Sequence, residues 1–468
     1  MTIIILPDDA LIYVFDFYLA ESLKVEAWHT LVHVCRRWRT IVFESPRRLN
    51  LRIACTDETS VNELLDVWPA LPIVISGECL TPTKHENIKA ALEHHDRVCQ
   101  IQLNVSLPSD LVEVFAALEA PFPLLTDLKL GSTGTPDPIL PNPVKFLGGS
   151  THLRSLSFSA ISVPGLPELL LSFTDLVNLE LDYIPILDIS SPDVMVTALS
   201  TLTRLETLHL NIASDPGWEN QPLPQPTRTA LLSLTSFKFI GANEYLEDFL
   251  SRIDAPLLDK LTSSLICFDP DIVLDTPQLL RFISRIPKFQ APDKAHIEID
   301  IPYYDSLFKV LINFSWPEQT STTLRLGIHW LTGEYIPRLV QFCHPPFISL
   351  PTLKYLYIDG GHFLRQQHLV DIENTRWLEL LQPFTAVTNL YLTKEFAPGI
   401  ARALQSLAGE TETVLPTLEN VFIEPESQPS SSVHEAIGQF AAARQLSGHP
   451  IAIYHWDGRQ GLEQFEDN

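Results

Sequence analysis

The sequence predicts an α/β protein in which a short helical module at the N-terminus precedes a long array of strand–helix units. Three observations predict this architecture. Leucine occupies 72 of the 468 positions, a high share for a mixed domain. An apolar pattern of the form L-x-x-L-x-L recurs along most of the chain. The first fifty residues lack that pattern and carry apolar residues at helical spacing instead.

The composition describes a globular, acidic chain. Hydrophobic residues make up 45% of it, and 32 Lys and Arg stand against 57 Asp and Glu, a formal net charge of -25. Nucleic acids and anionic membranes repel a polyanion, so neither is expected as a partner. Residues 1–52 carry 7 basic and 6 acidic side chains, so the remainder is the acidic part. No apolar run is long enough to span a bilayer, and we expect a cytoplasmic or nuclear protein.

The six cysteines are not spaced for a metal site or a disulfide framework. None forms a C-x-x-C pair, and the adjacent Cys343 and His344 cannot readily share one metal ion. Disulfides are also rare in a reducing compartment. We therefore expect no metal and no cofactor, and we expect the cysteines to be small buried residues. They are Cys35, Cys55, Cys79, Cys99, Cys267 and Cys343.

Two amphipathic segments follow one another within the first fifty residues. The first begins at Leu6-Pro7 and two aspartates, which suit the first turn of a helix, and continues with apolar residues at helical spacing. The second runs from Trp28 to Val42 and carries three arginines on its other face. A module of this size is near the limit of independent stability, so we expect its aromatic residues to be buried against a partner surface.

These segments resemble the F-box. The resemblance lies in Leu6-Pro7-x-x-x-Leu11-x-x-x-Phe15 and in Leu31-x-x-Val34-Cys35-Arg36-Arg37-Trp38-Arg39-x-Ile41, and residues 28–49 are similar to a large fungal group of F-box-like proteins. The resemblance implies docking to the Skp-type adaptor of a cullin–RING (SCF) ubiquitin ligase. Carried over position by position, the adaptor-facing set is Leu6, Pro7, Leu11, Phe15, Leu31, Val34, Cys35, Trp38 and Ile41.

The match departs from the family at two places. Ala10 stands where the family often has an acidic residue, and Leu49-Asn50 stands where many F-boxes end in Leu-Trp. The alternative is that residues 6–49 are only a helical cap, because a repeat array must cover its apolar end.

The remainder of the chain carries twelve copies of the apolar pattern. Their central residues are Ile101, Leu128, Leu156, Leu179, Leu208, Phe237, Leu261, Ile297, Leu324, Leu356, Leu390 and Val421, of which Leu261 belongs to the least clear copy. The eleven steps from residue 101 to residue 421 average about 29 residues, at the long end of the leucine-rich-repeat range. The Asn or Cys that usually follows the strand is absent, so the array resembles the degenerate repeats associated with F-box proteins.

Each copy predicts a strand with one buried face, and apolar faces between the copies predict helices. A strand, a crossover of a dozen or more residues and a further strand give parallel pairing. Units that cannot bury their own apolar side stack into a curved solenoid, with strands on the concave face and helices on the convex face. The predicted helical faces lie within 111–118, 246–253, 279–286, 400–407 and 433–440.

We expect four segments along the chain. They are an F-box-like helical domain at 1–52, a linker and N-terminal cap at 53–97, the leucine-rich-repeat solenoid at 98–457 and an acidic C-terminal tail at 458–468. A closed α/β domain with an irregular parallel sheet is the alternative, although eleven or twelve strands would strain an open sheet.

Motifs that carry catalysis are missing from the sequence. There is no G-x-S-x-G, no phosphate-binding loop and no dinucleotide-binding fingerprint. His94-His95-Asp96 and His455-Trp456-Asp457 are the candidates for a base, and either would require a deep polar pocket. We expect that the chain is not an enzyme.

The last strands of the array predict a binding surface. Residues beside the buried positions of a strand point away from the core, and here they are aromatic and acidic. The candidate client-binding residues are Tyr355, Tyr357, Asp359, Tyr391, Phe422 and Glu424. Tyrosine offers large contact area at small entropic cost, which favours binding. The alternative is that a C-terminal helix or loop covers these side chains.

We therefore expect a substrate-recognition subunit of an SCF-type E3 ubiquitin ligase, which holds the adaptor through the F-box and a client protein through the array. It would act by proximity, without bond chemistry of its own. The alternative function is a non-ligase leucine-rich-repeat scaffold or sensor whose helical start is only a cap.

Overall fold

The computed structural model contains two compact units, Met1–Leu205 and Glu206–Asn468. The structure describes residues 6–22, 25–58, 61–68, 70–79, 82–133, 139–140, 143–149, 152–185, 191–213, 228–267, 275–300, 308–317, 319–330, 352–360, 372–407, 414–425 and 431–457. The predicted tail at 458–468 lies outside these ranges, as does Cys343.

The N-terminal module consists of three helices rather than the two that the sequence indicates. They are α1 (Asp8–Glu21), α2 (Ala27–Val34) and α3 (Arg36–Glu44). The second amphipathic segment is interrupted at Cys35, whose φ of -160° and ψ of 170° are extended and therefore end α2 and precede α3. The interruption lets two short helices pack on α1 and form a small core.

The first unit continues with parallel strands separated by helices. The strands are β1 (Ile53–Thr56), β2 (Ile73–Cys79), β3 (Val98–Val105), β4 (Asp127–Ser132), β5 (Ser155–Ser159) and β6 (Asn178–Pro185). The helices are α4 (Val61–Val67), α5 (Pro82–Leu92), α6 (Pro108–Ala117), α7 (Leu166–Leu170) and α9 (Pro192–Ser200), with a 3-10 segment at Pro143–Gly149. Each strand pairs in parallel with the next one along the chain.

The second unit repeats this arrangement with one interruption. Its main strands are β7 (Thr207–Ala213), β9 (Ser236–Gly241), β11 (Lys260–Cys267), β12 (Lys294–Asp300), β13 (Phe308–Trp316), β14 (Gln319–Trp330), β15 (Tyr355–Gly360), β16 (Asn389–Leu392), β17 (Asn420–Ile423) and β18 (Ala452–His455). A small sheet pairs β8 (Thr229–Ala230) with β10 (Ile253–Asp254). The helices are α10 (Asn243–Arg252), α11 (Pro277–Arg285), α13 (Asn374–Leu381), α14 (Ala397–Ser406) and α15 (Ser431–Leu446), with a 3-10 turn at Pro287–Phe289.

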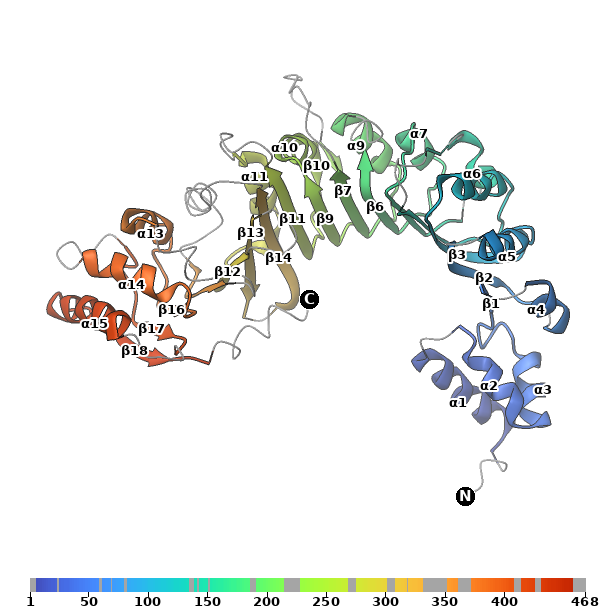
Figure 1. The fold of residues 1–468 in the computed structure, drawn as a ribbon, viewed down its shortest axis with the longest axis horizontal. Coiled ribbons are helices and arrows are strands. Elements are labelled where there is room, and N and C mark those ends of the chain that lie inside the picture. The colour runs from blue at the N-terminus through green and yellow to red at the C-terminus, as the bar shows by residue number, and fades with distance from the viewer. Residues whose placement is uncertain are drawn as a thin grey trace. The chain divides into compact units, whose positions relative to one another are not determined.

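In both units, the strands bury alternate residues beneath the helices, which lie along one side of the strands (Figure 1). In β4, Leu128 and Leu130 are buried while Lys129 between them is exposed. The predicted central residues of all twelve copies lie in strands, including the least clear copy at Leu261. We call the sheet face away from the helices the open face. The repeated units therefore form a leucine-rich-repeat type of array with one face of the strands buried beneath helices.

Residues 53–97 contain more than the linker and cap that the sequence indicates. The strands β1 and β2 pair in parallel with one another, and β2 pairs in parallel with β3. The strand array therefore begins at Ile53, two strands before the first predicted copy. These strands use isoleucine and valine in place of leucine, so the leucine pattern does not reveal them.

Parallel pairing, predicted for the whole array, is wrong between residues 294 and 330. There β13 pairs antiparallel with both β12 and β14. The links at 301–307 and 317–318 are too short for the crossover that parallel neighbours require. The order along the sheet is β11-β14-β13-β12-β15, and parallel pairing resumes at both sides of the insertion. Among the helices that the structure describes, none is long and apolar enough to cross a membrane.

Candidate functional site

The predicted adaptor-facing set divides into a buried and an accessible group. Four members form the interior of the N-terminal module, and these are Leu11, Phe15, Leu31 and Ile41. Three short helices must build their own core, and the apolar stripe that the sequence assigns to a partner largely serves that purpose. These four side chains are buried in the chain by itself, so their contact with an adaptor stays a prediction.

The other members of the set lie at or near the surface. Pro7, Val34 and Cys35 are exposed, whereas Leu6 and Trp38 are half-buried. The Trp38 ring packs on Phe15 with ring centroids 4.7 Å apart. Cys35 therefore departs from the expectation that the cysteines are buried, an expectation that Cys55 meets.

The largest exposed apolar feature of the module is the outer side of α1. Its members are Tyr13, Val14, Phe17 and Tyr18, with Tyr13 and Phe17 exposed to 68% and 69%. Residues four apart lie on one side of a helix, so these side chains form one stripe, which we call the α1 stripe. None of these residues belongs to the predicted adaptor-facing set, because that set follows the F-box resemblance, which gives Leu11 and Phe15 on this helix. The signal available was an Ile-Tyr-Val-Phe run with no polar residue.

The module is attached to the array through an aromatic cluster. Trp28 is almost fully buried and its Nε1 donates a hydrogen bond to the Arg52 carbonyl at 2.8 Å. The Trp28 ring meets Trp68 edge-on at 4.9 Å, and His29 stacks on Trp68 at 4.5 Å. Burial lowers the pKa of His29, since the neutral imidazole is favoured in this cluster. Trp28 is thus committed to the chain's own interior.

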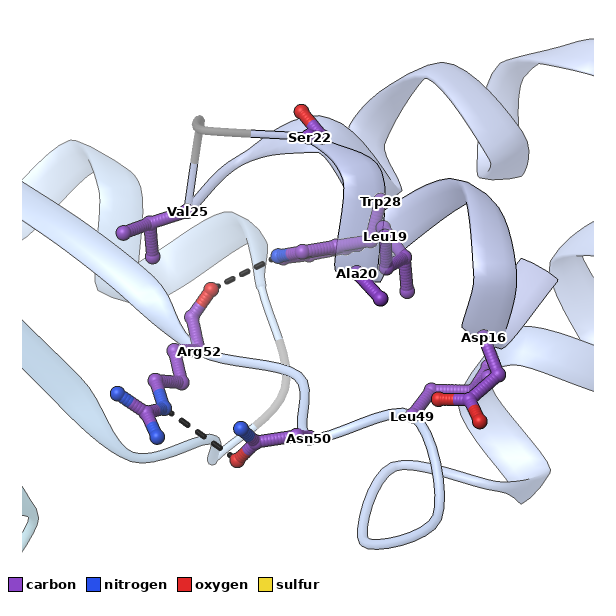
Figure 2. A pocket seen from close by; sticks show the side chains of 9 residues that line it. All are labelled: Asp16, Leu19, Ala20, Ser22, Val25, Trp28, Leu49, Asn50 and Arg52. Carbon is purple, nitrogen blue, oxygen red and sulfur yellow. Dashed lines mark hydrogen bonds between the residues drawn. The ribbon is translucent and has the colours of Figure 1, made fainter. Parts of the chain in front are cut away.

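A pocket of about 340 Å³ opens beside this attachment (Figure 2). Its walls come from the end of α1, the segment before α2 and residues 49–52. Asp16 and Arg52 supply opposite charges at its rim, and Arg52 Nε donates to the Asn50 side-chain oxygen at 3.3 Å. The volume is near the lower limit of small-molecule sites, and the walls are part apolar, so the pocket can accept a single side chain of a docking protein.

Three of the four predicted client-binding aromatics belong to a stacked row on the open face of the second unit, whereas Tyr355 aligns with Lys294 and Asn389 and lies outside the row. Strand register aligns His296 with Tyr357, Tyr357 with Tyr391, Tyr391 with Phe422, and Phe422 with Tyr454. Ring centroids are 4.3 Å apart for Tyr357 and Tyr391, 4.3 Å for Tyr391 and Phe422, and 5.1 Å for Phe422 and Tyr454. Neighbouring parallel strands are spaced about 4.8 Å apart, so in-register rings stack face to face. We call this row the aromatic ladder.

A residue after the last strand covers part of the ladder. Trp456 lies edge-on to Tyr391 at 5.3 Å and tilted against Tyr357 at 6.0 Å. Both Trp456 and Tyr357 are buried, and burial raises the pKa of the Tyr357 hydroxyl. Tyr357 is therefore a support of the ladder and not an accessible contact. Tyr355, Tyr391 and Phe422 are half-buried, and the sequence missed Tyr454, the exposed last ring.

The two predicted acidic residues flank the ladder on one side. Asp359 lies 3.7 Å from Nε2 of His296, and both belong to strands that the ladder crosses. Glu424 accepts the backbone N–H of Lys394 at 3.1 Å, and the Lys394 ammonium lies 3.9 Å away. Both carboxylates thus lie next to the ladder, Asp359 beside His296 and Glu424 beside Lys394.

The open face of the first unit has a different character. Lys129 and Glu180 form an ion pair at 3.7 Å, and Ser157 donates a hydrogen bond to Glu180 at 2.9 Å. These side chains come from β4, β5 and β6 and satisfy one another. The polar row thus resembles an ordinary solvated surface, whereas the aromatic ladder does not.

His95 and His455, from the two candidates for a base, belong to different units. Nδ1 of His95 lies 3.0 Å from the Pro121 carbonyl oxygen, and the His455 ring lies 5.5 Å from that of His434. In the described part of the chain, no group of three or more His, Cys, Asp or Glu is placed to hold a metal ion.

Comparisons with known proteins show resemblance without a family. No protein-family model matches the chain, and no curated protein matches it. Five chains of solved structures align with it, two of which are the following. One is the leucine-rich repeat-containing protein LegL7 of Legionella pneumophila, at 12% identity and a TM-score of 0.28 over 84% of this chain and 98% of that one. The other is a protein of Bacteroides fragilis, at 11% identity and a TM-score of 0.19 over 80% and 72%. The repeat architecture itself is thus read from the strands and helices described above.

Proposed function

We propose that this chain is a substrate-recognition subunit of an SCF-type E3 ubiquitin ligase. In this proposal the helical module holds the Skp-type adaptor and the array holds a client protein. The observation that carries the proposal is the α1 stripe on a module whose sequence resembles the F-box. A repeat array with an exposed aromatic surface supports the second half, since such arrays bind other proteins through extended faces.

The adaptor would contact the α1 stripe together with the exposed ends of α2 and α3. Four large apolar side chains in neighbouring turns make the kind of patch that marks a protein interface. Val34 and Cys35 extend the exposed apolar surface at the junction of α2 and α3. Leu11, Phe15, Leu31 and Ile41 would act indirectly in this proposal, by holding the three helices in place.

The function proposed here needs no reactive group in the chain. A client bound to the array and a ubiquitin-charged enzyme bound through the adaptor would share one complex, which raises the local concentration of client lysines. The aromatic ladder with Asp359 and Glu424 beside it favours a client segment that combines an apolar ring with a basic residue.

The deciding experiment is co-purification of the full chain with a Skp-type adaptor. We expect the wild-type protein to bind, and Phe17→Asp or Val34→Asp to reduce binding by at least about a hundredfold, because a buried unpaired carboxylate costs several kcal/mol. Leu232→Asp is the matched control, since Leu232 is equally exposed but lies in the second unit. A well-folded wild-type chain that binds no adaptor would disprove the proposal.

The second candidate function is a non-ligase scaffold or sensor whose module is only a cap. The burial of Trp28 against Trp68 favours it, because a cap must be joined to the array by its own apolar contacts. The two candidates differ in what the α1 stripe does. A scaffold remains fully functional with Phe17→Asp, whereas an SCF receptor does not.

A further inference from the structure

The last strand of the array has an unusual burial pattern. In β16 and β17 the second and fourth residues are buried beneath helices. In β18 the corresponding residues are exposed, and Ile453, which aligns with the fully buried Val421, is 38% exposed. Tyr454 on the opposite side of the strand is 48% exposed. Within the residues that the structure describes, an apolar residue on each face of β18 therefore lacks the neighbour that the next strand of an array would supply.

The outer backbone edge of β18 is also available. Ala452 and Trp456 donate their N–H groups to carbonyls of the β17 segment, at 2.8 and 3.0 Å. Alternate residues direct their backbone groups to opposite sides, so those of Ile453 and His455 point away from β17. β18 is the last strand of the sheet among the residues that the structure describes. It contains neither the lysine nor the proline that usually protects an edge strand from pairing.

The charge near this edge is low for so acidic a chain. Between Ser431 and Asp457 only Glu435, Arg444 and Asp457 are charged at neutral pH, leaving histidine aside, and Arg444 is buried. A chain with a net charge of -25 repels its own copies in general. Glu419 and Glu424 lie at the two ends of the neighbouring strand β17, whereas β18 itself contains no Lys, Arg, Asp or Glu and adds no like-charge repulsion at its edge.

We propose that two copies of this chain associate through β18, with the two strands antiparallel and related by a twofold axis at Tyr454. In this register the outward backbone groups of Ile453 meet those of the partner's His455, and those of His455 meet the partner's Ile453. Tyr454 then faces the partner's Tyr454 as a non-hydrogen-bonded pair, in which side chains approach most closely. The two aromatic ladders join into one continuous stack, and both open faces lie on the same side of the joined sheet.

The association stops at two copies. An isologous interface uses the same surface of both chains and is closed by its own symmetry. The other end of the array offers no second edge of this kind, because Ile53, Ala54 and Cys55 of β1 are all buried. A head-to-tail chain of copies therefore has no acceptor.

The first test is the mass of the full chain in solution as a function of concentration. Four residues of strand make a small interface, so we expect a reversible dimer with a dissociation constant between about 10 μM and 1 mM. Sedimentation analysis should show a mass that rises from 52.7 kDa toward twice that value. Tyr454→Lys should weaken the dimer at least about tenfold, while Leu232→Lys should not. A constant monomer mass up to about 0.5 mM overturns the proposal.

A second test reads the register. Two Cα atoms of a non-hydrogen-bonded pair lie about 4.5 Å apart, which is within the range of a disulfide. In a Cys35→Ser background, Tyr454→Cys should therefore form an intermolecular disulfide under mild oxidation. Ile453→Cys, which does not face its own copy, and Leu257→Cys, an exposed site elsewhere, should not. Equal cross-linking of all three variants contradicts the register and the proposal with it.

A third test asks whether the outer edge of β18 pairs with a second copy or with residues of the same chain. A chain that ends after Asp457 should dimerise as the full chain does. If only the shortened chain dimerises, residues 458–468 occupy the edge in the full protein and the proposal is overturned. None of these outcomes depends on adaptor binding, so the proposed function can fail while this inference stands.

Discussion

The two ends of the strand array differ in how they meet solvent. At β1, Ile53 is 1% exposed and Cys55 is fully buried, with the helical module and its Trp28 attachment close by. At β18, Ile453 is 38% exposed and Tyr454 is 48% exposed. An array of stacked units leaves one apolar layer uncovered at each end. In the described chain the helical module lies next to the first strand, β1. No described element plays this part at the other end, where the side chains of β18 are exposed.

The comparison teaches that capping and docking compete for the same side chains. Trp28, Leu49 and Leu51 are buried at the capped end and are unavailable to any partner. The α1 stripe lies on the outer side of that same module, where capping has no use for it. A module can therefore be both a cap and a docking surface, because the two tasks use opposite sides of its helices.

The largest effect should come from breaking the capped end. Trp28→Ala removes a buried indole and the hydrogen bond to the Arg52 carbonyl, and we expect a loss of about 3–5 kcal/mol in stability of the first unit. Chemical denaturation with hydrogen exchange at β1 measures this loss. Tyr454→Ala at the open end should cost less than about 1 kcal/mol. Equal losses at both ends would mean that β1 is not capped.

A matched pair of isoleucines compares the two ends directly. Ile53→Ala should cost about 2–4 kcal/mol because it leaves a cavity in a buried strand. Ile453→Ala should cost less than about 1 kcal/mol, since the side chain is partly solvated already. Denaturation is measured near 1 μM protein, at least about tenfold below the expected dissociation constant, so that the chain is monomeric. A large loss for Ile453→Ala would show that something covers the open end.

Thiol reactivity gives a third comparison within the first unit. Burial raises the pKa of Cys55 to about 11, while Cys35 is exposed between α2 and α3. At pH 8 we expect Cys35 to be alkylated at least about a hundredfold faster than Cys55, because the thiolate is the reacting form and Cys55 must first be uncovered. Mass spectrometry of the partly alkylated protein distinguishes the two sites. Trp28→Ala should reduce the difference by opening the capped end.

The smallest effect lies away from both ends. Glu247 of α10 accepts the N–H groups of Gln278 and Leu279 at 2.7 and 2.9 Å, yet burial raises its pKa to about 7. The folded state therefore holds a proton that the unfolded state releases near its ordinary pKa, so stability falls as pH rises from about 4.5 to 7. In Glu247→Gln the free energy of unfolding should fall by about 1–3 kcal/mol less than in the wild type between pH 4.5 and 7. Denaturation of the second unit at a series of pH values measures this difference. Protection of β1 should not change.

Much of the fold could be predicted from sequence because the patterns involved are local. The alternation around Leu128 and Leu390 predicts a strand without knowledge of its neighbours. The order of β12, β13 and β14 could not be predicted in the same way. The short links on either side of β13 indicate antiparallel pairing, but this inference is possible only if β13 is first identified as a strand. β13 carries three consecutive apolar residues, Val310, Leu311 and Ile312, which do not match the leucine pattern.

The candidate sites were predictable in part. The alternation rule placed Tyr391 and Phe422 on the open face, where the structure has them. It could not show that Trp456 returns across two strands to cover Tyr357, because that contact depends on the path of the chain after β18. The adaptor-facing set was harder, since a helical stripe such as Leu11 and Phe15 is identical in sequence whether it meets a partner or the protein's own core.

The sequence by itself determined where strands and helices form, because side-chain periods of 2 and 3.6 residues are properties of a few neighbours in the chain. The tertiary structure decided which apolar side chains remain in contact with water, because that depends on what other segments bring against them. Trp28 and Tyr454 are both large aromatic residues in short elements at an end of the array. One is enclosed by residues forty positions away and the other is not, and only the assembled fold could separate them.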